Sequence, residues 1–468
     1  MRWKTTLVLL LATVGIGAYV SLVELRQPTK EERTQEAQRL LTIKEEEVTG
    51  LAVTTKDAEA RMRRAADGWT LEPDGWRADP TVVHDILDRL PYLSAERTLE
   101  PTKDHPLDTA AFGLEPPEAK LDVQSPQPVT LRFGHTTPVG HRRYIQIEGR
   151  PEIFVVSTTL YEIIARPADV FRDPFFAPVQ EAGLESIATR SHSTAFKIGK
   201  QGQSWRLVEP LEDEADAPAV QELVRSLSQL PVQQYIGNLP EGQDLKSLGL
   251  EDAETQLTLA ETNKPPLVLS FGRFLTTDST LRYAKRSDDP KLYAVKGMDV
   301  EALFPKSDAI RSRACLPVAM ESVTSVVVQL PEISWSMERK DGHWVNENGE
   351  PVAAEVAESE IRGLADLRFN AIVADGATAE LPRYGLDKAD KDASRVILRA
   401  ADGKEYELKF GGGVEGEDER YGLIKPRNLL GTLPESAIQG LSAKPATGTP
   451  AAPQKSDADS QAPDHEER

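Results

Sequence analysis

Apolar and polar residues alternate along one short stretch that occurs three times in the chain. In the first copy, residues 129–134 read Val-Thr-Leu-Arg-Phe-Gly, so Val129, Leu131 and Phe133 fall on one face of a strand. The second copy, residues 267–272, and the third, residues 406–411, also end in Phe-Gly, and an Arg-Tyr pair follows each. The shared residues are Phe133, Gly134 and Arg143, then Phe271, Gly272 and Arg282, then Phe410, Gly411 and Arg420. The chain therefore reads as one module present three times.

Other elements recur in the same order around this stretch. Two short alternating segments lead to a tryptophan, and Trp69, Trp205 and Trp344 lie 136 and 139 residues apart. An amphipathic helix follows, which we expect Asp79 to cap in the first copy and Asp216 in the second. Next comes a turn whose glycine supplies a position of positive φ, namely Gly113, Gly249 and Gly385. A period this long indicates small domains rather than the turns of a solenoid.

These elements predict an α+β fold of three similar repeat domains with antiparallel sheets, at residues 45–180, 181–318 and 319–441. The junctions at 171–179 and 310–318 resemble each other, and the next strand begins soon after each. Connectors this short favour domains in contact over domains on a flexible string. The composition of residues 442–468, rich in Ala, Pro, Ser and Asp, predicts a disordered acidic tail.

The amino terminus carries 19 uncharged, mostly apolar residues at positions 5–23. As a helix, such a run spans about 28 Å, close to the thickness of a bilayer's hydrocarbon core. A cleavable signal peptide is the alternative, but no small-x-small cleavage motif follows the run. We therefore predict an uncleaved signal-anchor helix at 1–25 and a charged helical stalk at 26–44.

The orientation of the body across the membrane has two interpretations. Lys and Arg are more numerous after the apolar run than before it, which favours a cytoplasmic body. Long domains, however, translocate largely regardless of charge. We expect a single-pass inner-membrane protein with a periplasmic body, and a cytoplasmic body is the alternative.

Charge and cysteine content exclude several classes of function. The net charge is −20, which repels a phosphate backbone, so we expect no nucleic-acid partner. The single cysteine, Cys315, cannot form a disulfide within the chain, and we expect it to be a small buried residue.

The order of these motifs resembles a bacterial family called domain of unknown function 4340. The resemblance covers about residues 45–441 and rests on the membrane anchor, the Trp–helix–Gly-Leu–Phe-Gly–Arg-Tyr order and the repeated junction. Some members are similar to auxiliary components of gliding-motility-type ABC export systems, in which a membrane-anchored extracytoplasmic part accompanies a permease and an ATPase. The resemblance supplies no catalytic residues.

No catalytic, cofactor or metal signature stands out in the sequence. There is no phosphate-binding Gly-x-x-x-x-Gly-Lys-Ser/Thr, no His-Glu-x-x-His and no Gly-x-Ser-x-Gly motif. The Gly411-Gly-Gly413 run fits a hairpin loop better than a phosphate cradle, because no helix is predicted to follow it. His135 and His141 flank the first Phe-Gly loop without counterparts in the other copies, so we interpret them as solvated loop residues. We predict no enzyme activity, no cofactor and no metal site.

The Arg-Tyr pairs and the tryptophans have a structural and a functional interpretation. Adjacent residues of a strand point to opposite faces, so we expect each Tyr in the core and each Arg on the outer face near a carboxylate. The alternative makes Arg143, Arg282 and Arg420 ligand or partner contacts. The tryptophans could stack on sugars, but their fixed spacing favours core anchors.

The function that we predict is non-enzymatic. The chain would be an envelope scaffold or accessory protein, with ABC permease and ATPase subunits as partners. The alternative is an envelope-ligand binding protein, for a glycan or a peptide, that uses grooves between repeats.

Overall fold

The computed structural model describes residues 39–441, apart from 67, 103–105, 178, 377–380 and 388–392, and also Lys444. The predicted anchor at 1–25 lies outside the described residues, as do most of the stalk and of the tail. Within the described residues, no helix is both long and apolar enough to cross a membrane. The chain divides into two compact units, Met1–Phe176 and Ala177–Arg468.

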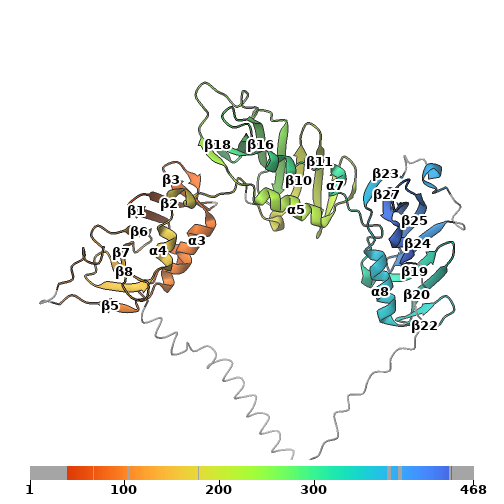
Figure 1. The fold of residues 1–468 in the computed structure, drawn as a ribbon, viewed down its shortest axis with the longest axis horizontal. Coiled ribbons are helices and arrows are strands. Elements are labelled where there is room, and N and C mark those ends of the chain that lie inside the picture. The colour runs from red at the N-terminus through yellow and green to blue at the C-terminus, as the bar shows by residue number, and fades with distance from the viewer. Residues whose placement is uncertain are drawn as a thin grey trace, which may run out of the picture. The chain divides into compact units, whose positions relative to one another are not determined.

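The first unit contains one antiparallel sheet of nine strands, in the order β4-β3-β2-β1-β6-β7-β8-β9-β5 (Figure 1). Two meanders meet at the β1–β6 pair, and the strand that follows the helix closes the far edge beside β9. The strands are β1 (Gly50–Thr55), β2 (Glu59–Ala65), β3 (Gly68–Glu72), β4 (Trp76–Arg77), β5 (Arg97–Leu99), β6 (Ala119–Gln124), β7 (Val129–Thr136), β8 (Arg142–Ile147) and β9 (Ile153–Ser157). The helices of this unit are α3 (Pro80–Arg89) and α4 (Thr159–Ile164).

The second unit contains two further nine-stranded antiparallel sheets with the same strand order. The strands of the second sheet are β10 (Leu184–Arg190), β11 (Ala195–Gln201), β12 (Ser204–Glu209), β13 (Asp213–Glu214), β14 (Gln234–Gly237), β15 (Thr255–Glu261), β16 (Leu267–Phe274), β17 (Leu281–Arg286) and β18 (Asp289–Lys296). Those of the third are β19 (Val323–Gln329), β20 (Ser334–Lys340), β21 (His343–Asn346), β22 (Pro351–Val352), β23 (Ala371–Asp375), β24 (Ser394–Ala400), β25 (Glu405–Gly413), β26 (Glu419–Lys425) and β27 (Leu429–Pro434). Its helices are α5 (Ala217–Ser228), α6 (Gly297–Ala302), α7 (Ser307–Ile310), α8 (Ala354–Ala365) and α9 (Glu435–Gln439). The predicted repetition of an antiparallel, sheet-based unit is confirmed, although strands outweigh helices more than expected.

The long helices of the first and second sheets begin where the sequence predicts. The Asp79 side chain accepts hydrogen bonds from the backbone N–H groups of Thr81 and Val82, and Asp216 accepts one from Ala219. These caps satisfy donors that the first helical turn leaves free. Helix α8 starts after Ala353, which has no side-chain cap. The four buried apolar residues of α3 are Val82, Val83, Ile86 and Leu87, whose burial contributes an upper estimate of roughly 6–12 kcal/mol.

Each sheet of the second unit has apolar residues on both faces. The long helix covers one face, and in the third sheet this core includes Trp344, Phe369 and Phe410. The opposite face carries a smaller cluster near the Gly-Leu turn, with Leu248, Leu250 and Tyr283 in the second sheet. Alternation along the strands supplies both clusters, because successive side chains point to opposite faces.

The three tryptophans do not share one environment. Trp205 and Trp344 are buried, as predicted for core anchors. Trp69 is only partly buried, so the prediction is wrong for the first sheet, where Trp76 is buried instead.

Candidate functional site

The Phe-Gly motif and the Gly-Leu turn form one contact in every repeat. A Cβ at Gly134 would lie 2.2 Å from the carbonyl oxygen of Phe112, in the turn. The corresponding distances are 2.3 Å from Gly272 to Leu248 and 2.2 Å from Gly411 to Tyr384. The turn glycines Gly113, Gly249 and Gly385 have φ values of 70°, 69° and 66°, which confirms the predicted positive φ. The two motifs therefore recur together because the carbonyl of one rests on the bare Cα of the other.

The Phe-Gly motif also marks an irregularity in the strand ladder. The register between β7 and β8 shifts between Phe133 and Thr136, and equivalent shifts follow Phe271 and Phe410. A bulge of this kind leaves backbone groups outside the regular ladder.

The arginines of the Arg-Tyr pairs point toward the bulge, and two of them bond its carbonyl oxygens, which corrects the prediction that they lie on the outer face. Arg143 is only 4% exposed and shares its face with buried Ile145. Arg282 donates from Nε to the Gly272 carbonyl at 2.9 Å, and Arg420 donates from Nη1 to the Gly411 carbonyl at 3.1 Å. The tyrosine beside each arginine points the other way, and Tyr144 meets Phe112 edge-on at 4.9 Å between ring centroids. The prediction that Arg and Tyr lie on opposite faces is confirmed, but the face of the arginines was wrong, because Arg282 and Arg420 donate to bulge carbonyls and Arg143 to the Thr136 hydroxyl beside the bulge.

The anionic partner of the arginine differs between repeats. Arg420 makes a forked pair with Glu435, through Nε at 3.0 Å and Nη2 at 2.9 Å. Burial lowers the pKa of Arg282, and the charge of Glu301 opposes that shift. Arg143 pairs through Nη2 with Glu118 at 2.8 Å. That these arginines contact a ligand or partner stays a prediction.

Arg143 belongs to a polar cluster in the first unit. Its guanidinium carbon lies 3.2 Å from the centroid of the Tyr161 ring, and Tyr161 Oη donates to Glu118 Oε2 at 3.2 Å. Nη1 of Arg143 bonds Thr136, while its buried Nε has no hydrogen-bond partner. Burial raises the pKa of Tyr161, the charge of Arg143 opposes this, and the charge of Glu118 adds to it. His135 approaches Glu118 at 3.8 Å.

Glu118 and Tyr161 face a groove of about 860 Å³ in the first unit. Its lining comes from the β1–β2 hairpin (residues 54–58), from the approach to β6 (residues 116–118 and Lys120) and from α4 with the segment behind it (Tyr161 and residues 165–168). A volume of this size suits a small-molecule or short-peptide ligand.

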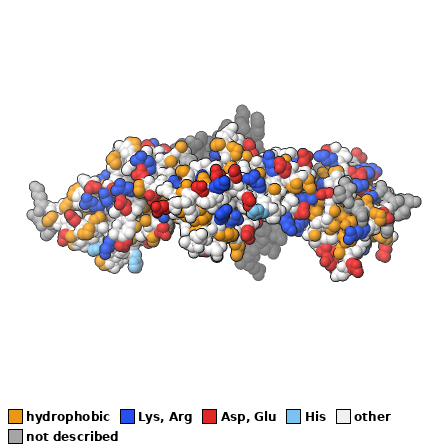
Figure 2. Space-filling view, turned by 90° about the horizontal axis from the view of Figure 1, so that it is seen from above, with side chains coloured by type: hydrophobic (Ala, Val, Ile, Leu, Met, Phe, Trp, Pro, Cys, Tyr) orange, Lys and Arg blue, Asp and Glu red, His pale blue; other side chains and the backbone are white. Residues whose placement is uncertain are grey.

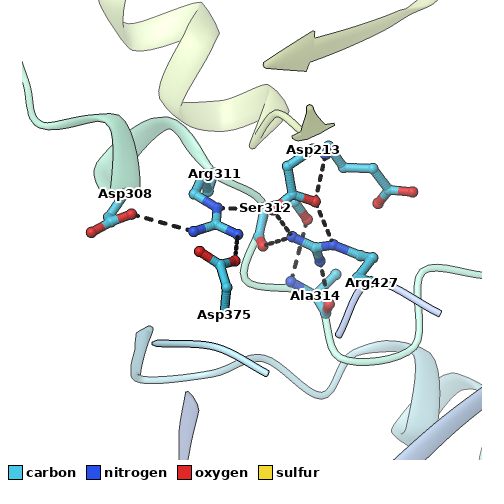
Figure 3. A network of polar contacts seen from close by, with 8 residues as sticks. Asp213, Asp308, Arg311, Ser312, Ala314, Asp375 and Arg427 are labelled. Carbon is cyan, nitrogen blue, oxygen red and sulfur yellow. Dashed lines mark hydrogen bonds and ion pairs between the residues drawn. The ribbon is translucent and has the colours of Figure 1, made fainter. Parts of the chain in front are cut away.

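A buried ion network joins the second sheet to the third within the second unit (Figure 3). Asp213, on edge strand β13, is 6% exposed and binds two arginines. Arg311, from the segment after α7, donates from Nε at 2.8 Å, and Arg427, from the β26–β27 turn, donates from Nε and Nη2 at 2.7 and 3.0 Å. Contact between consecutive domains was predicted from the short junction, and here it is confirmed.

The network extends beyond Asp213 to the backbone and to a second carboxylate. Arg427 also donates to the carbonyl oxygens of Ser312 at 2.7 Å and Ala314 at 3.0 Å, and Arg311 bonds Asp375 at 2.9 Å (Figure 3). Burial alone would raise the pKa of Asp213, but its bonds to Arg427 and Arg311 outweigh that effect and hold the pKa below its ordinary value. Every charge in this network therefore has a partner of opposite sign.

The tryptophans carry a further repeated feature. Each faces a basic residue across the strand pair, in the pairs Arg64–Trp69, Lys200–Trp205 and Arg339–Trp344. The cation lies 5.5 Å from the Trp69 ring centroid and 5.6 Å from that of Trp205. A face that a cation already covers is a poor platform for a sugar.

The remaining candidates are a metal site, the cysteine and the surface charges. Within the described ranges, no group of three His, Cys, Asp or Glu side chains is placed to hold a metal ion. Cys315 is buried, as expected, and burial raises the pKa of its thiol to about 12. On the face drawn in Figure 2, acidic and basic side chains are interspersed.

Sequence reasoning missed Asp213, Arg427, Glu118 and Tyr161. The correspondence of Arg172 with Arg311 in the two junctions was a usable signal for part of the ion network. None of the four missed residues lies in a recognisable sequence motif.

The chain belongs to the family described as domain of unknown function DUF4340, whose model matches residues 69–241 and 205–389. The two matches together span more than half of the sequence and overlap around Trp205. No curated protein and no solved structure matches the chain.

Proposed function

We propose that this chain is a non-enzymatic, membrane-anchored scaffold or accessory protein of the cell envelope. Its body would lie outside the cytoplasm, held by the apolar run at residues 5–23. Its partners would be the permease and ATPase subunits of an ABC-type export system. The observation that carries the proposal is the Asp213 network, because a scaffold must hold its modules at a fixed spacing.

The Asp213 network has a cost in desolvation and a gain in the geometry that it fixes. Burying three charges involves a large desolvation penalty, so such a network is weak evidence for stability alone. Its forked bonds instead favour one arrangement of the second sheet against the third. A repeated fold with a defined joint fits a protein that presents surfaces to partners.

Crosslinking in native membranes tests the proposal. The full-length, tagged chain is crosslinked in membranes of its own host and analysed by mass spectrometry. We expect crosslinks from the body to a permease and an ATPase; crosslinks that join only this chain to itself would contradict the proposal. Protease added outside spheroplasts should remove the body, and protection of the body would support the cytoplasmic alternative.

A matched pair of variants connects the network to partner capture. Asp213→Ala removes the shared anion, whereas Asp308→Ala removes a 64%-exposed carboxylate 3.5 Å from the same Arg311. We expect the first variant to lower partner recovery at least threefold and the second to leave it unchanged. Equal partner recovery with both variants would show that the Asp213 network does not support partner capture.

The second candidate function is binding of an envelope ligand, a glycan or a peptide. The observation that favours it is the 860 Å³ groove with the Arg143–Glu118–Tyr161 cluster beside it. Grooves between repeats were predicted for this role, whereas this groove lies within the first repeat. Equilibrium binding to the purified full-length chain, with and without Ala165→Phe in the groove, tests this candidate.

A further inference from the structure

We infer that the groove of the first repeat binds a short acidic peptide segment with small apolar or prolyl residues. The inference rests on the ligand-binding candidate above and names its ligand class and residues. It begins from a difference between the first and second repeats, which share strand order and bulge but carry different side chains at the positions that line this groove.

Strand register identifies the equivalent positions. Thr54 pairs with Glu59 in the first hairpin and Arg190 pairs with Ala195 in the second, which places Ala58 where Thr194 stands. Arg143 pairs with Val156 and Arg282 with Val295; counting on from these pairs places Ala165 where Phe304 stands. The first repeat therefore has alanine at two positions where the second has larger residues.

In the second repeat the larger residues contact their surroundings at the equivalent place. Thr194 Oγ1 donates to the Phe304 carbonyl at 3.3 Å, which joins the hairpin to the segment behind α6. The Phe304 ring packs on Phe271 at 6.1 Å between centroids. At the hairpin tip, His192 pairs with Glu254 at 2.6 Å, a second bridge across the same space.

In the first repeat the Tyr161 ring, not one at position 165, packs on the motif phenylalanine, at 6.1 Å between centroids from Phe133, and Ala58 carries no hydroxyl that could form the other contact. Lys56 and Glu118 occupy the positions of His192 and Glu254, and both line the open groove. Glu118 instead turns to Arg143 and Tyr161, so its charge is already compensated. Among the described residues, neither Lys56 nor Arg166 forms an ion pair, and both line the groove.

Charge and lining together select the ligand. Lys56 and Arg166 place two positive charges in the lining against the single carboxylate of Asp57, because Glu118 is paired with Arg143 and Lys120 with Asp122; the lining therefore favours an acidic group. The other half of the wall is small or apolar and includes Pro116, Pro117 and Pro167 together with the Tyr161 ring. Proline-containing peptides dock on aromatic-lined grooves, which fits this half of the wall.

Fluorescence anisotropy with the purified full-length chain in detergent tests the inference. The probe is fluorescein-labelled Ala-Pro-Glu-Pro-Ala-Glu, compared with Ala-Pro-Lys-Pro-Ala-Lys under the same label. We expect the acidic probe to bind at least tenfold more tightly, with a difference that shrinks as salt rises. Equal affinity for both probes, or no binding of the acidic one, would overturn the inference.

Variants locate the binding to the groove. Ala165→Phe introduces the residue that the second repeat carries at the equivalent position and places its ring in the groove. We expect it to weaken binding at least tenfold, as should Lys56→Glu. The control Lys246→Glu makes the same charge change at an exposed site of the second unit and should change binding less than twofold. Unchanged binding to both Ala165→Phe and Lys56→Glu would also overturn the inference.

The same assay separates this inference from the wider ligand-binding candidate. An oligogalacturonate hexamer is the second probe, because it is anionic but a glycan. If it binds in an Ala165→Phe-sensitive way and the acidic peptide does not, the groove binds a ligand but the peptide assignment is wrong. If neither probe binds, the inference fails.

Discussion

The first and second repeats have the same sheet, yet they differ at one end of it. Both place nine strands in the same order, both form the Phe-Gly bulge, and both direct an arginine to it. In the second, the Thr194 hydroxyl donates a hydrogen bond to the Phe304 carbonyl across that end. In the first, Ala165 and Ala58 leave a groove. The strand ladder and the bulge therefore specify the fold, while a few side chains at the hairpin end can change without disturbing it.

The largest effect on stability is expected from disrupting the turn–bulge contact that the repeats share. Gly411→Ala places a Cβ 2.2 Å from the Tyr384 carbonyl, a backbone atom that cannot move alone. We expect a loss of about 3 kcal/mol or more in the free energy of unfolding, or failure to fold. Thermal unfolding and hydrogen exchange of the third sheet measure it.

The adjacent residue is the control for this change. A Cβ at Gly412 would lie 3.7 Å from the same carbonyl, an ordinary contact. Gly412→Ala should therefore cost about 1 kcal/mol or less. Comparable losses from the two variants would show that the turn–bulge contact is not the reason for the glycine.

The next largest effect on stability is expected in the second unit, at the Asp213 network. Asp213→Ala leaves two arginines buried without their shared anion, and we expect a loss of about 3–5 kcal/mol confined to the second unit. Labelling of Cys315 reports this opening, because its buried thiol, with a pKa of about 12, should react slowly in the native protein. Faster labelling in Asp213→Ala than in Asp308→Ala is the expected result.

The pH dependence of this network has a definite sign. The pKa of Asp213 is lower in the folded protein than its ordinary value of 3.8, so the folded state favours the ionised carboxylate. The stabilisation is complete above pH 3.8 and is lost as the pH falls through the lower, folded-state value. As the pH falls below 3.8, the rate of Cys315 labelling, corrected for thiol ionisation, should therefore rise more steeply in the wild type than in Asp213→Asn. A wild-type profile identical to that of the variant would contradict the assignment.

A smaller effect on stability is expected from neutralising either of two glutamates at equivalent positions. Glu118→Gln removes the charge that faces buried Arg143, and we expect a loss of about 1–2 kcal/mol, since Glu118 is itself 37% exposed. Glu254→Gln removes a 70%-exposed partner of His192 and should cost less than about 0.5 kcal/mol. Denaturant unfolding of the two variants, followed by hydrogen exchange in β8 and β17, gives the difference. Equal losses would mean that the burial of Arg143 does not distinguish the repeats.

The smallest effect on stability is expected from filling the groove of the first repeat. Ala165→Phe fills space that is open in the first repeat and that a phenylalanine fills in the second, so we expect a change within about 1 kcal/mol. The melting temperature measures it. A loss larger than about 2 kcal/mol would show that the groove end of the first repeat cannot adopt the closed form.

Much of the fold could be read from the order of residues. The repeated Phe-Gly and Gly-Leu motifs, the Asp79 cap and the turn glycines are local requirements of backbone conformation, and the structure confirms them. The face of the arginines could not be read, because alternation says only that Arg and Tyr differ in face. Which face is buried depends on a bulge carbonyl from another strand.

The candidate sites depended on contacts between distant residues. Asp213 meets partners 98 and 214 residues later in the chain, and Tyr161 meets Glu118 across 43 residues. No local pattern records such pairs, since each residue alone is an ordinary surface type.

The threefold antiparallel module, with its glycines, two aspartate caps and helices, follows from the order of residues, because residue type sets these features at short range. The inward turn of the arginines, the joining of two sheets by Asp213 and the open groove of the first repeat depend on the folded chain. Burial, pairing of charges and cavity filling are set by which distant side chains meet, and no local pattern records those meetings.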